Sequence, residues 1–279
     1  MIKVGVIGWP VKHSRSPLIH NYWIKQNRLD ATYESQAVDP ASLKDFIRNL
    51  YAHGFSGCNV TIPHKEAALA FVDHYDECVA QTGSLNTIYL MDGKIRATST
   101  DGEGFYNNLL SKQPQFKATN KIAVMIGAGG SAKAICDKLL KENIHEIHVL
   151  NRTESRILDL QHIFGSKIKR LHSSNLEKQL TETDLLINTT SLGMIGQPEL
   201  QIDLSHLPAR AIVADIVYVP LKTALIKTAE ARGLIAVPGL GMLLHQAVEG
   251  FRLWFGLRPE VTKELYHLVE TDILREHPQ

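Results

Sequence analysis

A set of polar residues is spaced along the chain so that each falls at or just after the end of a short apolar run. The set holds hydroxyls, amides, one lysine and one acid. In open α/β sheets, ligands bind in the crevice at the carboxyl ends of the strands. Such a set suits a small polyhydroxylated substrate, with the lysine and the acid as the groups able to handle a proton. Its members are Ser14, Ser16, Asn59, Thr61, Lys65, Asn86, Thr87, Thr100 and Asp101.

Several of these residues also have a purely structural interpretation. Ser16 precedes Pro17 and could simply cap a helix. Thr61 faces one side of a predicted strand and could be structural. Lys65 stands at a predicted helix start and could be solvated. The positive end of a helix dipole disfavours a cation, however, which would suit Lys65 to giving up a proton.

A glycine-rich turn lies between a predicted strand and a predicted helix in KIAVMIGAGGSAKAI. It fits G-x-G-x-x-A, with Gly127 for the tight turn, Gly129 for close approach to a pyrophosphate and Ala132 for close packing of helix on strand. The N–H groups at the helix start would face the phosphates. The turn predicts dinucleotide binding, and a structural turn that has lost its ligand is the alternative.

The end of the next predicted strand indicates which dinucleotide binds. NAD-binding domains carry an acid there for the ribose 2′-hydroxyl, whereas this chain has Asn151-Arg152-Thr153, followed by Arg156. Arginine can grip a 2′-phosphate by charge-assisted hydrogen bonds. The exchange favours NADP over NAD. In the alternative, both arginines are solvated and Glu146 or Glu154 contacts the ribose.

The elements that must position these residues follow from an alternation of β-branched runs and amphipathic segments, which predicts βαβ units and mainly parallel sheets. Strands are predicted at Lys3–Gly8, Thr32–Val38, Gly57–Ile62, Leu85–Leu90 and Lys94–Ser99, with a hairpin across Asp92-Gly93, and then at Lys121–Ile126, Glu146–Leu150, Ile168–Leu171, Leu185–Asn188, Ala211–Val217 and Ile235–Val237. Helices are predicted at Pro17–Asn27, Pro40–Ala52, from His64 onward, from Gly102 to Leu110, and at Ser131–Glu142, Glu154–Phe164, Leu221–Arg232, Met242–Phe255 and Pro259–Leu274.

Two α/β domains are expected. The polar stretch Ser111–Asn120 separates the two regions, and the two helices after Gly239 are more than a doubly wound domain needs. We therefore predict a discontinuous substrate-binding domain, 1–102 plus 240–279, and a Rossmann-type dinucleotide-binding domain, 103–239. Because pockets favour domain interfaces, we expect the active-site cleft between them.

Composition excludes several classes of protein. Lys plus Arg number 30 and Asp plus Glu 29, so the net charge of +1 argues against a basic nucleic-acid face and against a polybasic membrane anchor. The 3 cysteines are widely spaced, and the 13 histidines form no H-E-x-x-H, so we assign no disulfide framework and no metal. The N-terminus is typical of a strand rather than a signal peptide. A reducing, cytoplasmic location is expected.

Taken together, the motifs identify a resemblance to the shikimate dehydrogenase family from Gly5 to about Phe255. The matching segments are GxPxxHSxSPxxHN (Gly8–Asn21), NVTIPHK (Asn59–Lys65), LNT (Leu85–Thr87), TDG (Thr100–Gly102), GAGGSA, NRT, NTTSLGM (Asn188–Met194), DIVYVPLKT (Asp215–Thr223) and GLGMLLHQA (Gly239–Ala247). The resemblance implies reversible reduction of 3-dehydroshikimate to shikimate by NADPH, in chorismate and aromatic amino-acid biosynthesis. It leaves open whether the protein is a monomer or a homodimer.

The resemblance also implies roles for individual residues. Lys65 and Asp101 would form the catalytic pair. The substrate carboxylate would contact Ser14 and Ser16, with Tyr218 nearby, and the ring hydroxyls would contact Asn59, Thr61, Asn86 and Gln246. The cofactor would contact Gly127, Ala128, Gly129, Gly130, Ser131, Asn151, Arg152, Thr153 and Arg156, its nicotinamide side would be lined by Thr190, Ile216, Gly239 and Met242, and Glu77 would lie near it.

Two positions depart from the family's pattern. Ser99 stands where Asn commonly precedes TDG, and Ser84-Leu85 stand where Ala-Val commonly precede Asn86. Both changes concern residues beside the matched ones and leave the expected reaction as it is. The alternatives are a quinate/shikimate dehydrogenase of dual specificity, a non-catalytic NADP(H)-binding sensor, and a folate-metabolising dehydrogenase of similar architecture.

Overall fold

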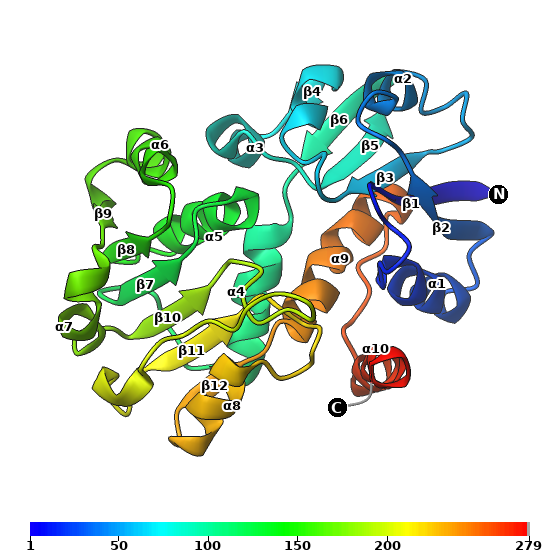
Figure 1. The fold of residues 1–279 in the computed structure, drawn as a ribbon. Helices are drawn as coiled ribbons and strands as arrows, with labels where there is room; N and C mark the ends of the chain where they lie inside the picture. The colour runs from blue at the N-terminus through cyan, green and yellow to red at the C-terminus, as the bar shows by residue number, and fades with distance from the viewer. Residues whose placement is uncertain (278–279) are drawn as a thin grey trace. The chain divides into compact units, whose positions relative to one another are not determined.

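The computed structural model describes residues 1–277, and the chain divides into two compact units. Unit 1 comprises Met1–Asp101 and Gln246–Val269, and unit 2 comprises Gly102–His245 with the residues from Glu270 on. Each unit is built on one six-stranded sheet (Figure 1). The predicted α/β class with mainly parallel sheets is confirmed. The functional domain bounds 1–102 plus 240–279 and 103–239 stay a prediction, whose residues 278–279 lie outside the described part of the chain.

The sheet of unit 1 has the order β2-β1-β3-β5-β6-β4 and is mixed. β1 runs parallel to β2 and β3, whereas β5 runs antiparallel to β3 and β6. The predicted hairpin joins β5 to β6, and Asp92 and Gly93 both have the positive φ that a tight hairpin turn requires. The strands are β1 (Ile2–Gly8), β2 (Ala31–Ala37), β3 (Gly57–Val60), β4 (His74–Tyr75), β5 (Thr87–Met91) and β6 (Lys94–Thr98).

The helices of unit 1 are α1 (Ser16–Gln26), α2 (Leu43–Arg48) and α3 (Glu77–Thr82), together with the segments of α9 (Leu240–Phe255) and α10 (Lys263–Glu276) that belong to this unit. α2 is shorter than predicted because the Asp39 carboxylate accepts the N–H groups of Ala41 and Ser42 and holds a turn before the helix. Arg15 occupies the N-cap position of α1, so Ser16 is its first residue and not its cap.

The prediction of a helix from His64 onward is wrong. Only a short 3₁₀ helix forms there, at Ala67–Phe71. The His64 ring Nε2 lies 2.6 Å from the Val38 carbonyl oxygen, and the chain is already extended at Val72. Asp73 N–H then donates to the Ile95 carbonyl at 2.8 Å, so pairing with the sheet takes over from helix formation. The helix-dipole argument for Lys65 therefore does not hold.

An aromatic cluster lies between α1, β2 and the end of α9. His20 is fully buried, and its ring is parallel to that of Tyr33, with the centroids 4.2 Å apart. Phe251 packs edge-on against Trp23 at 5.5 Å, and Trp254 packs against His20 at 5.3 Å. Both indole N–H groups donate to backbone carbonyls, at 3.0 and 2.9 Å. Burial lowers the pKa of His20 to about 3, so this ring is neutral within the core.

Unit 2 contains a parallel sheet of order β12-β11-β10-β7-β8-β9. The order reverses between β7 and β10, which is the switch point where doubly wound folds bind their ligands. Its strands are β7 (Ile122–Ile126), β8 (Glu146–Leu150), β9 (Ile168–Arg170), β10 (Leu185–Asn188), β11 (Ile212–Asp215) and β12 (Ile235–Val237). Its helices are α4 (Asp101–Lys112), α5 (Gly130–Lys141), α6 (Glu154–Phe164), α7 (Leu176–Leu180) and α8 (Ala224–Ala231), in addition to its part of α9 and α10.

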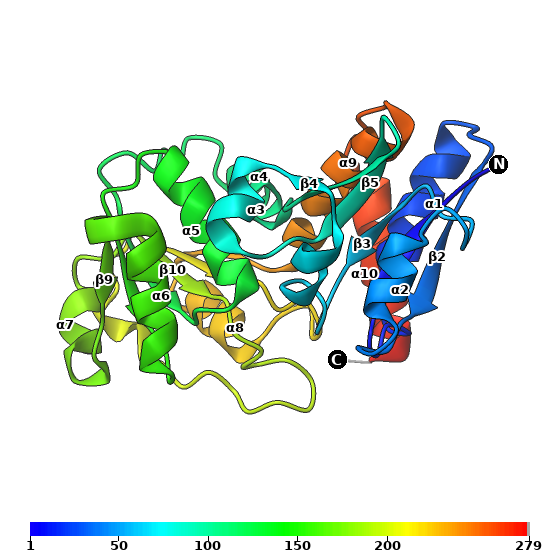
Figure 2. The same cartoon turned by 90° about the horizontal axis from the view of Figure 1, so that it is seen from above.

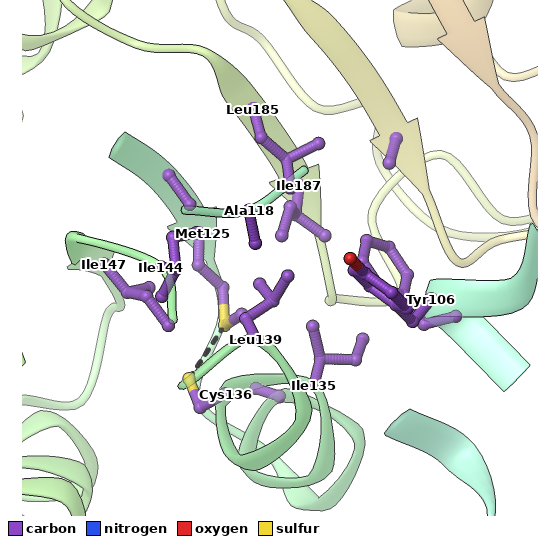
Figure 3. Close-up of a cluster of buried hydrophobic side chains, with 14 of the residues drawn as sticks. Tyr106, Ala118, Met125, Ile135, Cys136, Leu139, Ile144, Ile147, Leu185 and Ile187 are labelled. Carbon is purple, nitrogen blue, oxygen red and sulfur yellow. Dashed lines mark hydrogen bonds between the residues drawn. The ribbon is translucent and has the colours of Figure 1, made fainter. Parts of the chain in front are cut away.

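Alternate residues of these strands feed two cores on opposite faces of the unit 2 sheet. On one face Met125 and Ile187 pack against α4, α5 and α6, and on the other Val124 and Leu186 pack against α7 and α8 (Figures 1 and 2). Figure 3 shows the first core, where the Cys136 thiol lies 3.7 Å from the Met125 sulfur. Burial raises the pKa of that thiol, which is a packing group.

Within residues 1–277, no helix is both long and apolar enough to cross a membrane. Nor does any cluster of three or more His, Cys, Asp or Glu side chains in that range have an arrangement that could hold a metal ion.

Candidate active site

Lys65 and Asp101 form an ion pair in unit 1. Lys65 Nζ donates to Asp101 Oδ2 at 2.6 Å, and the two side chains are 20% and 8% exposed. Lys65 lies in the turn that follows β3, and its own backbone carbonyl accepts a hydrogen bond from the Leu85 N–H at 2.9 Å. Asp101 is the first residue of α4. A largely buried lysine held by a carboxylate is a group that can move a proton at a fixed position.

Asn86 holds the other oxygen of Asp101. Its Nδ2 donates to Asp101 Oδ1 at 2.7 Å and also lies 2.9 Å from Thr100 Oγ1 and 3.3 Å from Gln246 Oε1. Its Oδ1 accepts Thr100 N–H at 2.9 Å and the Thr87 hydroxyl at 3.0 Å. Asn86 and Gln246 are therefore brought together with Lys65 and Asp101. Thr87 and Thr100, for which the sequence indicates no individual role, fix the asparagine.

Asn59 is buried beside this group, at the end of β3. Its Nδ2 donates to the Asn86 carbonyl and to Thr87 Oγ1, each at 3.1 Å. Thr61 follows, half-buried, and its N–H donates to the Ile7 carbonyl at 2.9 Å. The two residues thus emerge from neighbouring points of the same strand end.

The two serines lie in the turn between β1 and α1. Ser16 is buried, and its N–H donates to Ser14 Oγ at 3.3 Å, while Ser14 N–H donates to the Val11 carbonyl at 3.1 Å. Both are placed at the carboxyl end of β1, which neighbours β3 in the sheet. All the candidate substrate residues except Tyr218 therefore belong to unit 1. Tyr218 is half-buried in unit 2.

The glycine turn of unit 2 has the geometry that its sequence predicts. Gly127 has φ +110°, and a Cβ there would lie 2.6 Å from Thr189 Oγ1. Gly129 caps α5 with no side-chain hydrogen bond, and the space where its Cβ would stand is open. Ala132 is fully buried, as close packing of helix on strand requires. The open N-terminus of α5 and the missing Cβ atoms fit a dinucleotide pyrophosphate.

The residues after β8 leave two arginines available. Arg152 and Arg156 are exposed, and neither guanidinium group has a hydrogen bond or ion pair to any residue of the range 1–277. Asn151 Nδ2 holds this turn by donating to the Thr153 carbonyl at 2.8 Å, and Thr153 is the N-cap of α6. Unpaired guanidinium groups at this place suit a phosphate.

The two acids that could instead have contacted a ribose are both engaged. Glu154 pairs with Arg170. Glu146 pairs with His148 at 3.1 Å and with Lys169 at 3.6 Å. Their engagement favours the arginines as the residues that select the cofactor.

The residues expected at the nicotinamide side gather around the ends of β10 and β11. A Cβ on Gly127 would lie 2.9 Å from Thr190 Cγ2, so Thr190 flanks the glycine turn. A Cβ on Gly239 would lie 2.5 Å from the Ile216 carbonyl oxygen. Met242 is buried in the core cluster against which Ile216 packs. The described structure thus brings these residues together, whereas Glu77 is an exposed residue at the start of α3 in unit 1.

Asp215 holds the ends of β10 and β11 together by three hydrogen bonds. Its carboxylate accepts the Val217 N–H at 2.9 Å, Asn188 Nδ2 at 3.0 Å and the Thr223 hydroxyl at 2.7 Å. Asn188 Oδ1 in turn accepts the Thr190 hydroxyl at 2.7 Å. Burial raises the pKa of Asp215 from 3.8 to about 6, although its three hydrogen bonds oppose the change.

Replacing Asp215 by Asn should remove a pH-dependent part of the free energy of unfolding. Because the pKa of Asp215 is about 6 in the folded chain and near 3.8 when unfolded, the folded state binds the proton more tightly between those values. The native protein should therefore lose about 1 kcal/mol of stability from pH 5 to pH 7 relative to Asp215→Asn. Urea unfolding of both proteins across pH 4–8 measures this, and parallel curves would contradict it.

Comparison with known proteins gives three family matches along the chain. Residues 6–88 match the shikimate dehydrogenase substrate binding domain, 109–216 match shikimate / quinate 5-dehydrogenase, and 239–263 match the shikimate 5'-dehydrogenase C-terminal domain. The shikimate dehydrogenase (NADP(+)) of Nitrobacter hamburgensis is 50% identical over 274 residues, which are 98% of this chain and 95% of the relative. That of Rhodopseudomonas palustris strain TIE-1 is 48% identical over 268 residues, 96% of each chain.

The chain belongs to the shikimate dehydrogenase family. The resemblance predicted from the motifs is thereby confirmed.

Solved structures agree with this assignment. Shikimate 5-dehydrogenase from Thermus thermophilus, in complex with NADP(H) and shikimate, superimposes with a TM-score of 0.85 at 31% identity and covers 99% of each chain. Quinate dehydrogenase from Corynebacterium glutamicum, in complex with NAD, superimposes with a TM-score of 0.88 at 28% identity, over 97% of this chain and 99% of that one.

Proposed function

We propose that this protein is an oxidoreductase that catalyses the reversible NADPH-dependent reduction of 3-dehydroshikimate to shikimate, a step of chorismate and aromatic amino-acid biosynthesis. The observation that carries the proposal is the Lys65–Asp101 pair, 2.6 Å apart and held by Asn86, in a chain half identical to an NADP-dependent relative. Its surroundings are hydroxyls and amides, which suit a polyhydroxylated ring.

The division of labour in the reaction follows from the chemistry of these side chains. Bound NADPH supplies the hydride that reduces the ketone. Lys65 Nζ donates a proton to the substrate oxygen as negative charge develops on it, and takes a proton back in the reverse direction. Asp101 orients the ammonium group through its 2.6 Å hydrogen bond and accepts a neighbouring substrate hydroxyl.

The remaining unit 1 residues are proposed to bind and orient the substrate. Ser14 and Ser16, joined by a hydrogen bond, would hold the carboxylate. Tyr218, which belongs to unit 2, is proposed as a further contact of that carboxylate. The ring hydroxyls would contact Asn59, Thr61, Asn86 and Gln246. Clustering of the two asparagines and Gln246 around the catalytic pair supports this assignment.

All the proposed cofactor residues except Glu77 belong to unit 2. The pyrophosphate would lie on the glycine turn Gly127–Ser131 at the start of α5, and Arg152 and Arg156 would bind the 2′-phosphate, with Asn151 and Thr153 shaping their turn. Open space at Gly129 and the two unpaired arginines support the choice of NADP. Thr190, Ile216, Gly239 and Met242 would line the nicotinamide side, and Glu77 is proposed as a further cofactor contact.

Turnover by the purified protein tests the function. Shikimate with NADP⁺ should give a steady rise in nicotinamide absorbance, and parallel reactions with NAD⁺, or with quinate in place of shikimate, should be much slower. Turnover only with quinate or NAD⁺ would keep the family and overturn the specificity. A folded protein that binds NADPH and turns over neither substrate would favour the sensor alternative.

We also place the protein in the cytoplasm, since none of Cys58, Cys78 and Cys136 forms a disulfide and a reducing compartment keeps thiols in that state. Its partners are proposed to be the small-molecule substrate and cofactor, without nucleic acid or membrane. Sedimentation would decide between the predicted monomer and homodimer.

A further inference from the structure

Tyr33 is a buried phenol of β2 that reaches the candidate substrate residues. It is 2% exposed, and its hydroxyl donates to Asn59 Oδ1 at 2.6 Å. Burial raises the pKa of Tyr33 well above its usual value, opposed by a hydrogen bond from the Ser16 side chain. The phenol therefore stays protonated and lies between a residue proposed for the carboxylate and one proposed for a ring hydroxyl.

The hydrogen-bond directions around Asn59 leave it one orientation. Its Nδ2 donates one hydrogen to the Asn86 carbonyl and the other to Thr87 Oγ1, each at 3.1 Å. Its Oδ1 therefore faces Tyr33, which must be the donor. What Asn59 can offer a ligand is the second lone pair of Oδ1, so Asn59 would accept from a substrate hydroxyl.

A continuous series of hydrogen bonds connects Asn59 to the catalytic pair. The Thr87 hydroxyl accepts from Asn59 and donates to Asn86 Oδ1 at 3.0 Å. Asn86 Nδ2 donates to Asp101 Oδ1 at 2.7 Å, and Lys65 donates to Asp101 Oδ2. Each hydroxyl in this series has a single hydrogen, so the direction of every bond depends on that of its neighbour.

The Tyr33 ring is itself fixed in place. It stacks on His20 with centroids 4.2 Å apart and planes 8° from parallel, and it also packs against Trp254 at 5.9 Å. Because its aromatic neighbours already fix the phenol, it can hold the Asn59 amide in one rotamer without a further loss of side-chain conformational entropy. Phenylalanine would keep this packing and lose only the hydroxyl.

We propose that Tyr33 is a positioning residue for substrate specificity, which fixes Asn59 as a hydrogen-bond acceptor for one ring hydroxyl and links it to the serines on the carboxylate side. Tyr33 acts through Asn59 and Ser16 and does not touch the reacting atoms. The inference rests on the proposed function, because it assumes that Asn59 contacts a substrate hydroxyl.

Steady-state kinetics of Tyr33→Phe test the proposal. The KM for shikimate should rise roughly three- to tenfold, the range expected for one hydrogen bond. The kcat and the KM for NADP⁺ should stay within about twofold, because the catalytic pair and the cofactor residues are untouched. Tyr106→Phe is the matched control: this buried phenol lies in unit 2 and should leave the KM for shikimate unchanged.

Ring deoxy analogues of shikimate separate positioning from a general structural effect. For the analogue that lacks the hydroxyl contacted by Asn59, native protein and Tyr33→Phe should have the same KM, whereas the other analogues should keep the difference. A uniform rise for every analogue, an unchanged KM for shikimate, or a fall in kcat alone would overturn the proposal. If the native protein does not turn over shikimate, the proposed function fails instead. The thermal midpoint of each variant confirms that the chain is folded.

Discussion

Lys65→Ala should reduce kcat for shikimate oxidation by about 10²–10⁴-fold, the usual worth of general acid–base catalysis. The KM for shikimate should stay within a few fold, because the hydroxyls and amides that surround the pair remain. The physical reason is that Lys65 Nζ, 2.6 Å from Asp101 and only 20% exposed, is an ammonium group held inside the polar cluster that includes Asn86 and Gln246. Initial rates over a range of shikimate concentrations measure both constants.

The control is Lys44→Ala, an exposed lysine of α2 in the same unit, which should leave kcat unchanged. Circular dichroism should show that Lys65→Ala is folded, since the variant leaves the Asp101 carboxylate with Asn86 but without its cation. A folded Lys65→Ala protein with native kcat would remove the lysine from the chemistry.

Arg152→Ala should weaken the binding of NADPH about ten- to a hundredfold and leave the binding of NADH nearly unchanged. A hydrogen bond to a charged group contributes roughly 1.5–3 kcal/mol, which corresponds to that range. Arg152 is exposed beside the N-cap of α6, and its guanidinium forms no hydrogen bond or ion pair with the described residues, so it is available to a 2′-phosphate. Fluorescence titration with each nucleotide gives the two dissociation constants.

Arg232→Ala provides the comparison for that experiment. Its guanidinium lies in the same unit and donates to the Ser205 carbonyl at 3.2 Å, so its loss should alter neither constant. Equal weakening of NADPH and NADH by Arg152→Ala would show that the arginine supports the fold of the turn. The choice of NADP would then rest on another residue.

Local patterns were the part of this molecule that could be predicted from sequence. The glycine turn lies within a single strand–turn–helix unit, so Gly127, Gly129 and Ala132 could be assigned their places before any fold was known. Contacts between side chains far apart in the sequence could not be predicted in this way. Lys65 and Asp101 are 36 residues apart, and the residues alone indicated only that a lysine and an acid stood at strand ends.

Where tertiary contacts outweigh local preference, the local sequence pattern predicts the wrong element or indicates no role for a residue. The residues that follow Pro63 favour a helix from His64 onward, but the Asp73 N–H pairs with the Ile95 carbonyl of the sheet instead. Tyr33 is, in the sequence, an ordinary aromatic residue of a strand, and only the fold shows that its hydroxyl meets Asn59. The only signal for it was a phenol on the buried face of a strand, which nothing in the local pattern distinguishes from core packing.

The aromatic cluster of unit 1 has a spectroscopic consequence. The chain has 3 tryptophans, Trp9, Trp23 and Trp254, and all belong to unit 1. Selectively excited indole emission therefore reports on that unit alone, with Trp23 at 2% exposure expected to emit to the blue and Trp9 at 51% to the red. Denaturation followed by this emission and by far-ultraviolet dichroism would give coincident curves if the two units unfold together, and separate curves if each melts by itself.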